Sequence, residues 1–320
     1  MATQIRSAAA LIPLLLILLL TACSERHSEQ VLMRVGTNLW PGYEPLYLAR
    51  DLGYLNASQT RLVEYPSASE VITAYRNGAI EIAALTLDEV LLLAQHGLDP
   101  HIVLVMDISN GGDVIIGREG MSDVTSLKGK RVAVESTALG AFVLSRALSI
   151  NGMEKDDIEI VHTELLDHER VFVEGEVDAV VSFDPVRTRL LNSGGKELFS
   201  SRELPNEIVD VLVVRGEFMA QHSDQVGELL NQWFKANEYM NGNPQDAALR
   251  ISKRLGISPE EFIESLNGLE IPDRETNLRM LAGERPELIA SGNKLKLVML
   301  SSDLLLNDID IETIIDGRGL

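Results

Sequence analysis

Two runs of alternating β-rich segments and helical stretches constrain the fold of this chain more than any other feature of its sequence. Residues 31–106 hold the first run, and residues 114–214 hold the second. Helical segments of the first run end at glycine, which favours the left-handed conformation that closes a helix, as at Gly53 and Gly78. Such alternation is typical of βαβ units, so it predicts largely parallel sheets with helices on both faces.

The hydrophobic periodicity places the individual segments. Strands are predicted at residues 31–36, 61–65, 80–85, 102–106, 114–116, 131–134, 158–162, 179–182 and 209–214. Helices are predicted at residues 45–52, 69–76, 88–95, 141–151 and 168–174, and beyond residue 215 at 225–240, 246–255 and 259–266. The apolar runs 295–299 and 304–306 are also interpreted as helical.

A break at residues 109–112 (SNGG) separates the two runs. Glycine permits backbone conformations that other residues resist, so this segment is interpreted as a hinge. The predicted organisation is a signal peptide at residues 1–22, a tether at 23–30, lobe 1 at 31–110 plus 213–320, and lobe 2 at 111–212. The predicted fold class is α/β, with two lobes, mixed and mainly parallel sheets, and a helical C-terminal region.

The first 22 residues predict a signal peptide. Arg6 supplies a positive start, and the uncharged run at residues 8–20 is shorter than the about 20 apolar residues that span a bilayer. Residues 20–23 (LTAC) then look like a bacterial lipobox, in which the thiol of Cys23 takes the lipid. The alternative is an ordinary secretory signal with a stray cysteine. We expect a lipid anchor in the cell envelope, with Ser24 favouring the outer membrane over the outer face of the cell membrane.

Composition and missing motifs exclude several classes of protein. The formal net charge of −20 argues against nucleic-acid binding, which requires basic patches. Cys23 is the only cysteine, so no disulfide can form within the chain. The sequence has no helical metal-binding histidine pair, nucleophile elbow, phosphate-binding loop or dinucleotide motif. We therefore expect a protein that is not an enzyme and that has no metal and no cofactor.

Several motifs also resemble a known family. Residues 40–49 (WPGYEPLYLA), 52–54 (LGY), 127–134 (LKGKRVAV), 175–179 (GEVDA) and 183–185 (FDP) match, in order and spacing, the nitrate, sulfonate, taurine and thiamine-pyrimidine solute-binding family. The resemblance covers residues 33 to 265. It implies a type II periplasmic-binding-protein fold that closes around a small molecule and delivers it to an ABC permease and its ATPase. Related pyrimidine-synthesising enzymes carry a cysteine-rich motif, which a single cysteine cannot supply.

Loops at the carboxyl ends of parallel strands are where such sheets bind ligands. Trp40 and Tyr43 follow the first strand, where their rings would stack on a planar ligand or contact a cation, although Trp40 could instead pack at the edge of its lobe. Thr86 ends the third strand and offers a hydroxyl, while Asp88 reads as a helix N-cap. Asn110 in the hinge is a further candidate.

The second lobe offers a comparable set of candidates. Residues 134–140 leave a strand and begin a helix, whose free N–H groups attract anions unless Ser136 or Thr137 merely caps it. The resemblance implies that this loop contacts the ligand, so Glu135 and Leu139 are candidates too. The remaining candidates are Phe183 and Asp184, of which Asp184 is an N-cap in the simpler interpretation, and Asp210 near the return crossover.

Acidic side chains outnumber basic ones in these loops. Asp107, Glu135, Asp184 and Asp210 are candidate acids, while few arginines lie nearby. This balance favours a small nitrogen-containing organic solute, such as an aminopyrimidine or an amino-sulfonate, over nitrate or a plain sulfonate.

Two roles remain open for a protein of this kind. One is a monomeric solute-binding protein of an ABC importer, and the other is a ligand-sensing subunit of a membrane signalling system. Both roles would use the same ligand-driven shift between open and closed lobes.

Overall fold

The computed structural model describes residues 31–135 and 138–320, which form two mixed β-sheets. The first sheet has the strand order β11-β4-β10-β3-β1-β2, and the second has the order β7-β6-β8-β5-β9. The strands of the first sheet are β1 (Met33–Thr37), β2 (Thr60–Glu64), β3 (Ile82–Thr86), β4 (Pro100–Ser109), β10 (Val209–Arg215) and β11 (Leu269–Glu270). Those of the second are β5 (Asp113–Gly117), β6 (Arg131–Val134), β7 (Glu159–His162), β8 (Ala179–Phe183) and β9 (Lys196–Ser200).

Each sheet combines a parallel core with antiparallel strands. β1 runs parallel to β2 and β3, as the βαβ pattern predicts, while β10 runs antiparallel between β3 and β4. In the second sheet β6 runs parallel to β7 and β8, and β5 runs antiparallel between β8 and β9. The antiparallel strands are therefore the ones next to the two crossings of the chain between the sheets.

The chain crosses from the first sheet to the second after β4 and returns before β10. The predicted hinge at residues 109–112 coincides with the first crossing. Residue 212 was expected in the second lobe, but it lies inside β10, which pairs with β3 and β4 of the first sheet. The return therefore falls between residues 200 and 209, and it begins with the 3-10 turn η5 (Ser201–Glu203). β9, the strand that precedes this return, was not predicted.

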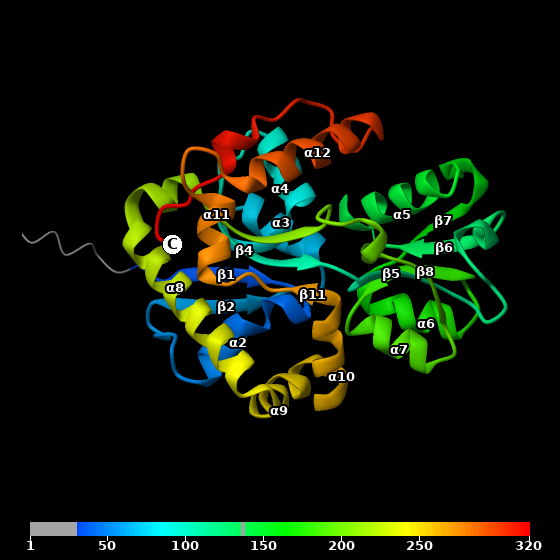
Figure 1. Cartoon of the computed structure of the whole chain (residues 1–320), viewed down its shortest axis with the longest axis horizontal. Helices are drawn as coiled ribbons and strands as arrows, with labels where there is room; N and C mark the ends of the chain where they lie inside the picture. The colour runs from blue at the N-terminus through cyan, green and yellow to red at the C-terminus, as the bar shows by residue number, and fades with distance from the viewer. Residues whose placement is uncertain (1–30, 136–137) are drawn as a thin grey trace, which may run out of the picture. The chain divides into compact units, whose positions relative to one another are not determined.

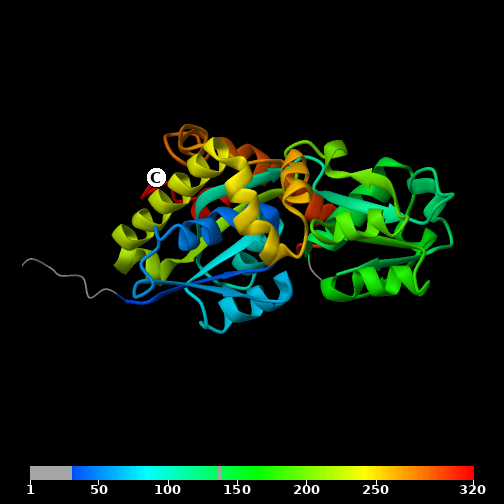
Figure 2. The same cartoon turned by 90° about the horizontal axis from the view of Figure 1, so that it is seen from below.

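Helices cover both faces of each sheet (Figure 1). Around the first sheet lie α2 (Glu44–Asp51), α3 (Ala68–Arg76), α4 (Leu87–Gln95), α8 (Gly216–Gly242), α9 (Pro244–Leu255), α10 (Pro259–Ser265), α11 (Arg274–Leu281) and α12 (Glu287–Ser301). Around the second lie α5 (Ala138–Ile150), α6 (His168–Val173) and α7 (Val186–Asn192). α8 and α9 cross the outer face of α2, where Figure 2 shows them in yellow.

Short 3-10 turns complete the described elements. Besides η5 they are η1 (Pro41–Tyr43), η2 (Val124–Leu127), η3 (Lys155–Asp157), η4 (Leu165–Asp167), η6 (Leu266–Gly268) and η7 (Ile311–Ile314). None of the described helices is both long enough and apolar enough to cross a membrane.

Apolar packing explains why the central strands read as continuous hydrophobic runs. β3, β4 and β10 carry fully buried Val, Ile and Leu on both faces, as expected for strands covered by helices on two sides. One apolar cluster continues from α3 and α4 into the α5 side of the second sheet, and α4 packs directly on α5. A second cluster lies under α2 and α8, and a third lies under α6 and α7.

The C-terminal region departs from the sequence prediction in detail. The run at residues 295–299 is helical within α12, but residues 304–306 are not. Asp303 adopts a left-handed conformation (φ 55°) that ends the helix, which buries Leu305 and leaves Leu306 exposed. α7, α11 and β11 were not predicted, and α8 begins nine residues before the expected start, with a kink at His222.

The open edge of β4 is completed by a side chain instead of a strand. β11 pairs only with Ile108 and Ser109, so Val105 turns its backbone toward α11. There the fully buried Asn277 amide accepts from the Val105 N–H (2.8 Å) and donates to the Val105 carbonyl (3.1 Å). Asn277 thus imitates a neighbouring strand at that position.

We predict that Asn277→Leu destabilises the protein by about 2–4 kcal/mol, because two buried backbone groups of Val105 lose their partner. The urea midpoint measures the effect. Asn241→Leu, at an exposed position of α8, is the matched control and should change the midpoint little. An equal midpoint for Asn277→Leu and wild type would show that Asn277 does not support this edge.

Candidate functional site

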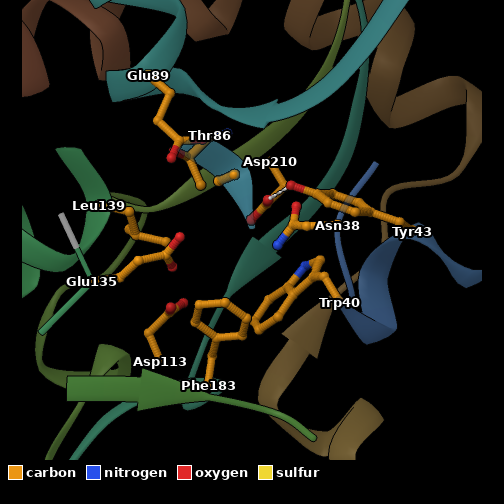
Figure 3. A pocket seen from close by; sticks show the side chains of 11 residues that line it. Asn38, Trp40, Tyr43, Thr86, Glu89, Asp113, Glu135, Leu139, Phe183 and Asp210 are labelled. Atoms are coloured by element: carbon orange, nitrogen blue, oxygen red, sulfur yellow. Dashed lines mark hydrogen bonds between the residues drawn. The ribbon is translucent and has the colours of Figure 1, made fainter. Parts of the chain in front are cut away.

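A pocket lies where loops of both sheets meet (Figure 3). The lining residues come from the carboxyl ends of parallel strands and from the starts of antiparallel strands. They are Asn38, Trp40, Tyr43, Ala68, Thr86, Glu89, Asp113, Glu135, Leu139, Phe183 and Asp210.

Strand register brings the acidic residues to this point. Asp210 begins β10 and lies directly opposite Thr86 of β3 on one side and Asp107 of β4 on the other. Asp113 begins β5 and lies opposite Phe183, the last residue of β8. An antiparallel strand starts where its neighbour ends, so both aspartates reach the ligand-binding edge of their sheets.

Trp40 forms the aromatic wall of the pocket. Its indole N–H donates to Asp107 Oδ2 (2.9 Å), and its ring meets Phe183 edge-on with a centroid separation of 5.5 Å. A Cβ on Gly42 would lie 1.8 Å from Asp107 Oδ2, so glycine is required beside the Trp40–Asp107 contact. The sequence Trp-Pro-Gly at residues 40–42 therefore has a packing reason as well as a place in the pocket.

Tyr43 and Asp210 form a buried pair behind the pocket. The Tyr43 hydroxyl donates to Asp210 Oδ1 at 2.5 Å. Burial raises the pKa of Tyr43 well above its ordinary value, and the neighbouring carboxylates raise it further. Burial likewise raises the pKa of Asp210, with the charge of Asp107 as the second cause. This pair fixes the Tyr43 ring and carries polar oxygen atoms into the cleft.

Glu89 caps the start of α4 from inside the pocket. Glu89 Oε2 accepts from the Thr86 N–H (3.0 Å), which satisfies one of the free donors at the helix end. Its other oxygen, Oε1, is buried without a hydrogen-bond partner. Burial, with the charge of the adjacent Asp88 as the second cause, raises the pKa of Glu89 to about 8.

Asp113 and Glu135 bring two more carboxyl groups from the second sheet. Asp113 Oδ2 and Glu135 Oε1 are both buried without hydrogen-bond partners. Burial raises the pKa of each group to about 7. For Glu135 this value includes the charge of Glu164, which raises the pKa, and the Ala68 N–H at the start of α3, which lowers it. Figure 3 shows the carboxyl groups of Glu89, Asp113 and Glu135 turned toward the same space.

Most of the predicted site residues line this pocket. They are Trp40, Tyr43, Thr86, Glu135, Leu139, Phe183 and Asp210. Their contact with a ligand stays a prediction. Ser136, Thr137 and the expected lipidation residue Cys23 lie outside the described residues.

Asn110 and Asp184 are not among the lining residues. Asn110 is exposed and donates to Glu270 Oε1 (2.8 Å), so it ties the hinge to β11. Asp184 accepts from the Thr188 N–H (3.1 Å) and hydroxyl (2.7 Å) and lies 3.5 Å from Arg187. It therefore acts at the start of α7, as its N-cap interpretation implied.

Four lining residues were not predicted: Asn38, Ala68, Glu89 and Asp113. Glu89 stands three residues after Thr86, a spacing that indicates a helix cap and hides a second role. Asn38 directly follows β1, a position that could have identified it. Ala68 and Asp113 carry no sequence signal of their own. Within the described ranges, no three His, Cys, Asp or Glu side chains are placed to hold a metal ion.

The chain is similar to known proteins in sequence and in fold. A Brucella abortus protein provisionally named a binding protein is 21% identical over 172 residues, which are 51% of this chain and 53% of that protein. The chain thus spans about half the length of this relative. The alkanesulfonate-binding protein of Xanthomonas axonopodis, bound to MOPS, superposes with a TM-score of 0.74 at 17% identity over 87% of this chain and 96% of its own.

A third protein shares the same architecture. The ligand-binding component of an ABC-type import system from Staphylococcus aureus, solved with zinc bound, superposes with a TM-score of 0.76 at 15% identity over 91% of this chain and 98% of its own. The chain therefore has the two-lobed periplasmic-binding-protein fold that the sequence predicted. These relatives are named for binding, in agreement with the prediction that the chain is not an enzyme. The profile of the NMT1-like family matches residues 26–256, and the chain belongs to that family.

Proposed function

We propose that this protein is the extracytoplasmic solute-binding component of an ABC importer and captures a small nitrogen-containing organic solute. One observation carries the proposal: a single pocket takes its lining from loops at the edges of both sheets. The named relatives support the transport role, since one is a component of an import system and another binds alkanesulfonates. The permease would bind the closed form of the protein.

Closure of the two lobes would create the site. Trp40 and Glu89 come from the first sheet, while Asp113 and Phe183 come from the second, so neither sheet makes the site alone. The two crossings of the chain between the sheets are natural hinges, because the backbone there belongs to neither sheet. A ligand that bridges both walls would shift the population toward the closed form.

The chemistry of the walls supports a nitrogen-containing ligand. Carboxyl groups accept hydrogen bonds from N–H groups, and the Trp40 and Phe183 rings offer apolar surface to a carbon skeleton. A plain sulfonate has only acceptor oxygens and would need donors at the same positions.

We predict that ligand binding shortens the distance between the lobes. Mature protein that lacks Cys23 has no cysteine. A pair of spin labels can therefore be attached to cysteines introduced by Ser193→Cys and Glu260→Cys. These exposed positions flank the contact in which Asn192 of α7 donates to Glu261 of α10 (3.1 Å). Double electron–electron resonance should show a shorter and narrower distance distribution with solute.

A pair within one lobe is the control for that measurement. Arg76→Cys and Gln221→Cys both lie on helices of the first sheet and should report no change. An unchanged distance for Ser193 and Glu260 with saturating solute would contradict closure.

We predict that Trp40→Ala weakens solute binding by about 10- to 30-fold, because the aromatic wall is lost. Trp40→Phe keeps a ring and loses only the bond to Asp107, so it should weaken binding less. Isothermal titration calorimetry measures both, and circular dichroism checks that the variants fold. Equal affinity for wild type and Trp40→Ala would remove Trp40 from the site.

The proposed anchor is the lipidated Cys23. We predict that Cys23→Ser moves the protein from the membrane fraction to the soluble envelope fraction, because the acyl chains have no attachment point. Cell fractionation measures the change, with the lipid-modified and unmodified forms separated by mass. Retention of the serine variant in the membrane would contradict this anchor.

A further inference from the structure

We infer that the solute is an organic cation whose positive charge is held between Glu89, Asp113 and Glu135. This inference rests on the proposed function. It names a narrower class of solutes than the proposed function does, because it requires a positive charge. An amino-sulfonate and a neutral aminopyrimidine both satisfy the broader proposal, and both fail the narrower one.

The first step is the arrangement of unpartnered oxygens. Glu89, Asp113 and Glu135 are 1%, 2% and 4% exposed, so solvent does not satisfy their carboxyl groups. Each has one buried oxygen without a hydrogen-bond partner. The three side chains come from α4, β5 and the end of β6, and all line one pocket. A buried acceptor that lacks a donor carries a free-energy cost, which a ligand with N–H donors relieves.

The second step is the lack of counter-charges in the lining. The described lining residues include no lysine, arginine or histidine. Nearby, Arg187 is engaged by Asp184 (3.5 Å) and Glu197 (3.0 Å). His168 contacts the Ser182 hydroxyl and the Thr163 carbonyl, and burial lowers its pKa to about 4, which leaves it neutral. A positive charge must therefore come with the ligand.

The third step concerns two helix starts beside the pocket, those of α4 and α3. The first turn of α4 is capped by Glu89, which accepts from the Thr86 N–H. The first turn of α3 is capped by Ser67, whose hydroxyl oxygen accepts from the Glu70 N–H (3.3 Å), and Glu135 interacts with the Ala68 N–H. At these two helix starts a sulfonate would meet carboxylates where it needs donors.

The fourth step gives the shape of the cation. Trp40, Phe183 and Leu139 also line the pocket, and their apolar surfaces favour a carbon skeleton over a bare metal ion. A cation next to an aromatic ring is further stabilised by the negative face of the ring. Amines, amidines and guanidines combine such a skeleton with a positive charge that carries N–H donors.

Proton release is the expected signature of such binding. The pKa values of Glu89, Asp113 and Glu135 stand at about 7 to 8 without ligand, so these carboxyls are partly protonated near neutral pH. A cation favours their ionised form and therefore expels protons, and its affinity rises with pH. The titratable and charged groups around the pocket are Tyr43, Asp88, Glu89, Asp107, Asp113, Glu135, Glu164, His168, Asp184, Arg187 and Asp210.

The test is calorimetry on the mature chain, stripped of bound solute by unfolding and refolding. The probes are putrescine and agmatine as organic cations, taurine as a zwitterion, ethanesulfonate as an anion, 4-aminopyrimidine near pH 8 as a neutral base, and Zn²⁺ and Mg²⁺ as bare cations. Titrations run from about pH 6 to about pH 8.5 in two buffers with different ionisation enthalpies, which measures proton release.

We expect an organic cation to bind with proton release and with an affinity that rises about tenfold or more over this range. Glu89→Gln and Glu135→Gln keep the shape of the side chain and should weaken its binding about 10- to 100-fold. Glu217→Gln, an exposed carboxyl on α8, should leave binding unchanged.

The inference is overturned if no organic cation binds or if only a metal ion binds. It is also overturned if taurine, ethanesulfonate or the neutral pyrimidine binds instead, or if cation binding is insensitive to Glu89→Gln and Glu135→Gln. Binding and lobe closure with taurine or the neutral pyrimidine would overturn the inference and leave the proposed function standing. Cation binding without any change in the lobe distance would overturn the transport role and leave the assigned chemistry standing.

Discussion

Removal of carboxyl groups from water is the constraint on which this site depends. Glu89, Asp107, Asp113 and Asp210 are buried within a few residues of strand ends, and desolvation is the largest cause of the raised pKa of each. Two of them have partners inside the protein, since Trp40 donates to Asp107 and Tyr43 donates to Asp210. Glu89, Asp113 and Asp107 each keep one buried oxygen without a hydrogen-bond partner. Buried polar groups are normally hydrogen-bonded, so a group of unpartnered oxygens around one pocket favours a ligand there.

The topology places these unpartnered carboxyl oxygens where a ligand can donate hydrogen bonds to them. Parallel strands deliver Trp40, Thr86 and Glu135 to the carboxyl edges of the two sheets, and the antiparallel strands β5 and β10 begin at those same edges with Asp113 and Asp210. The strands next to the crossings of the chain thus contribute to the site. Away from the pocket, the buried Glu44 is paired with Arg254, which also stacks on Tyr47.

The alternation of strands and helices was enough to predict the fold class and the position of the first crossing. Strands that are buried on both faces have nearly continuous hydrophobic sequences, so they can be recognised from the sequence. The second crossing was misplaced because β9 is only half apolar and β10 follows it closely. Seven of the predicted candidates line the pocket, among them Leu139, which the resemblance to the family implied. Glu89 was missed because its role as a helix cap is a complete local explanation, and Asn277 was missed because its partner Val105 is 172 residues away.

The same carboxyls link stability to ligand charge. A carboxyl whose folded pKa lies above its ordinary value stabilises the fold at low pH, and that contribution is lost as pH rises through the folded value. For Glu89, Asp113 and Glu135 the loss begins near the ordinary carboxyl pKa of about 4 and is complete by about pH 7–8. Glu135 also interacts with the Ala68 N–H at the start of α3, so its ionisation acts where the two sheets meet. Under the proposed function, an empty cleft would be less stable at neutral pH than at low pH, and the proposed cation would supply the missing positive charge.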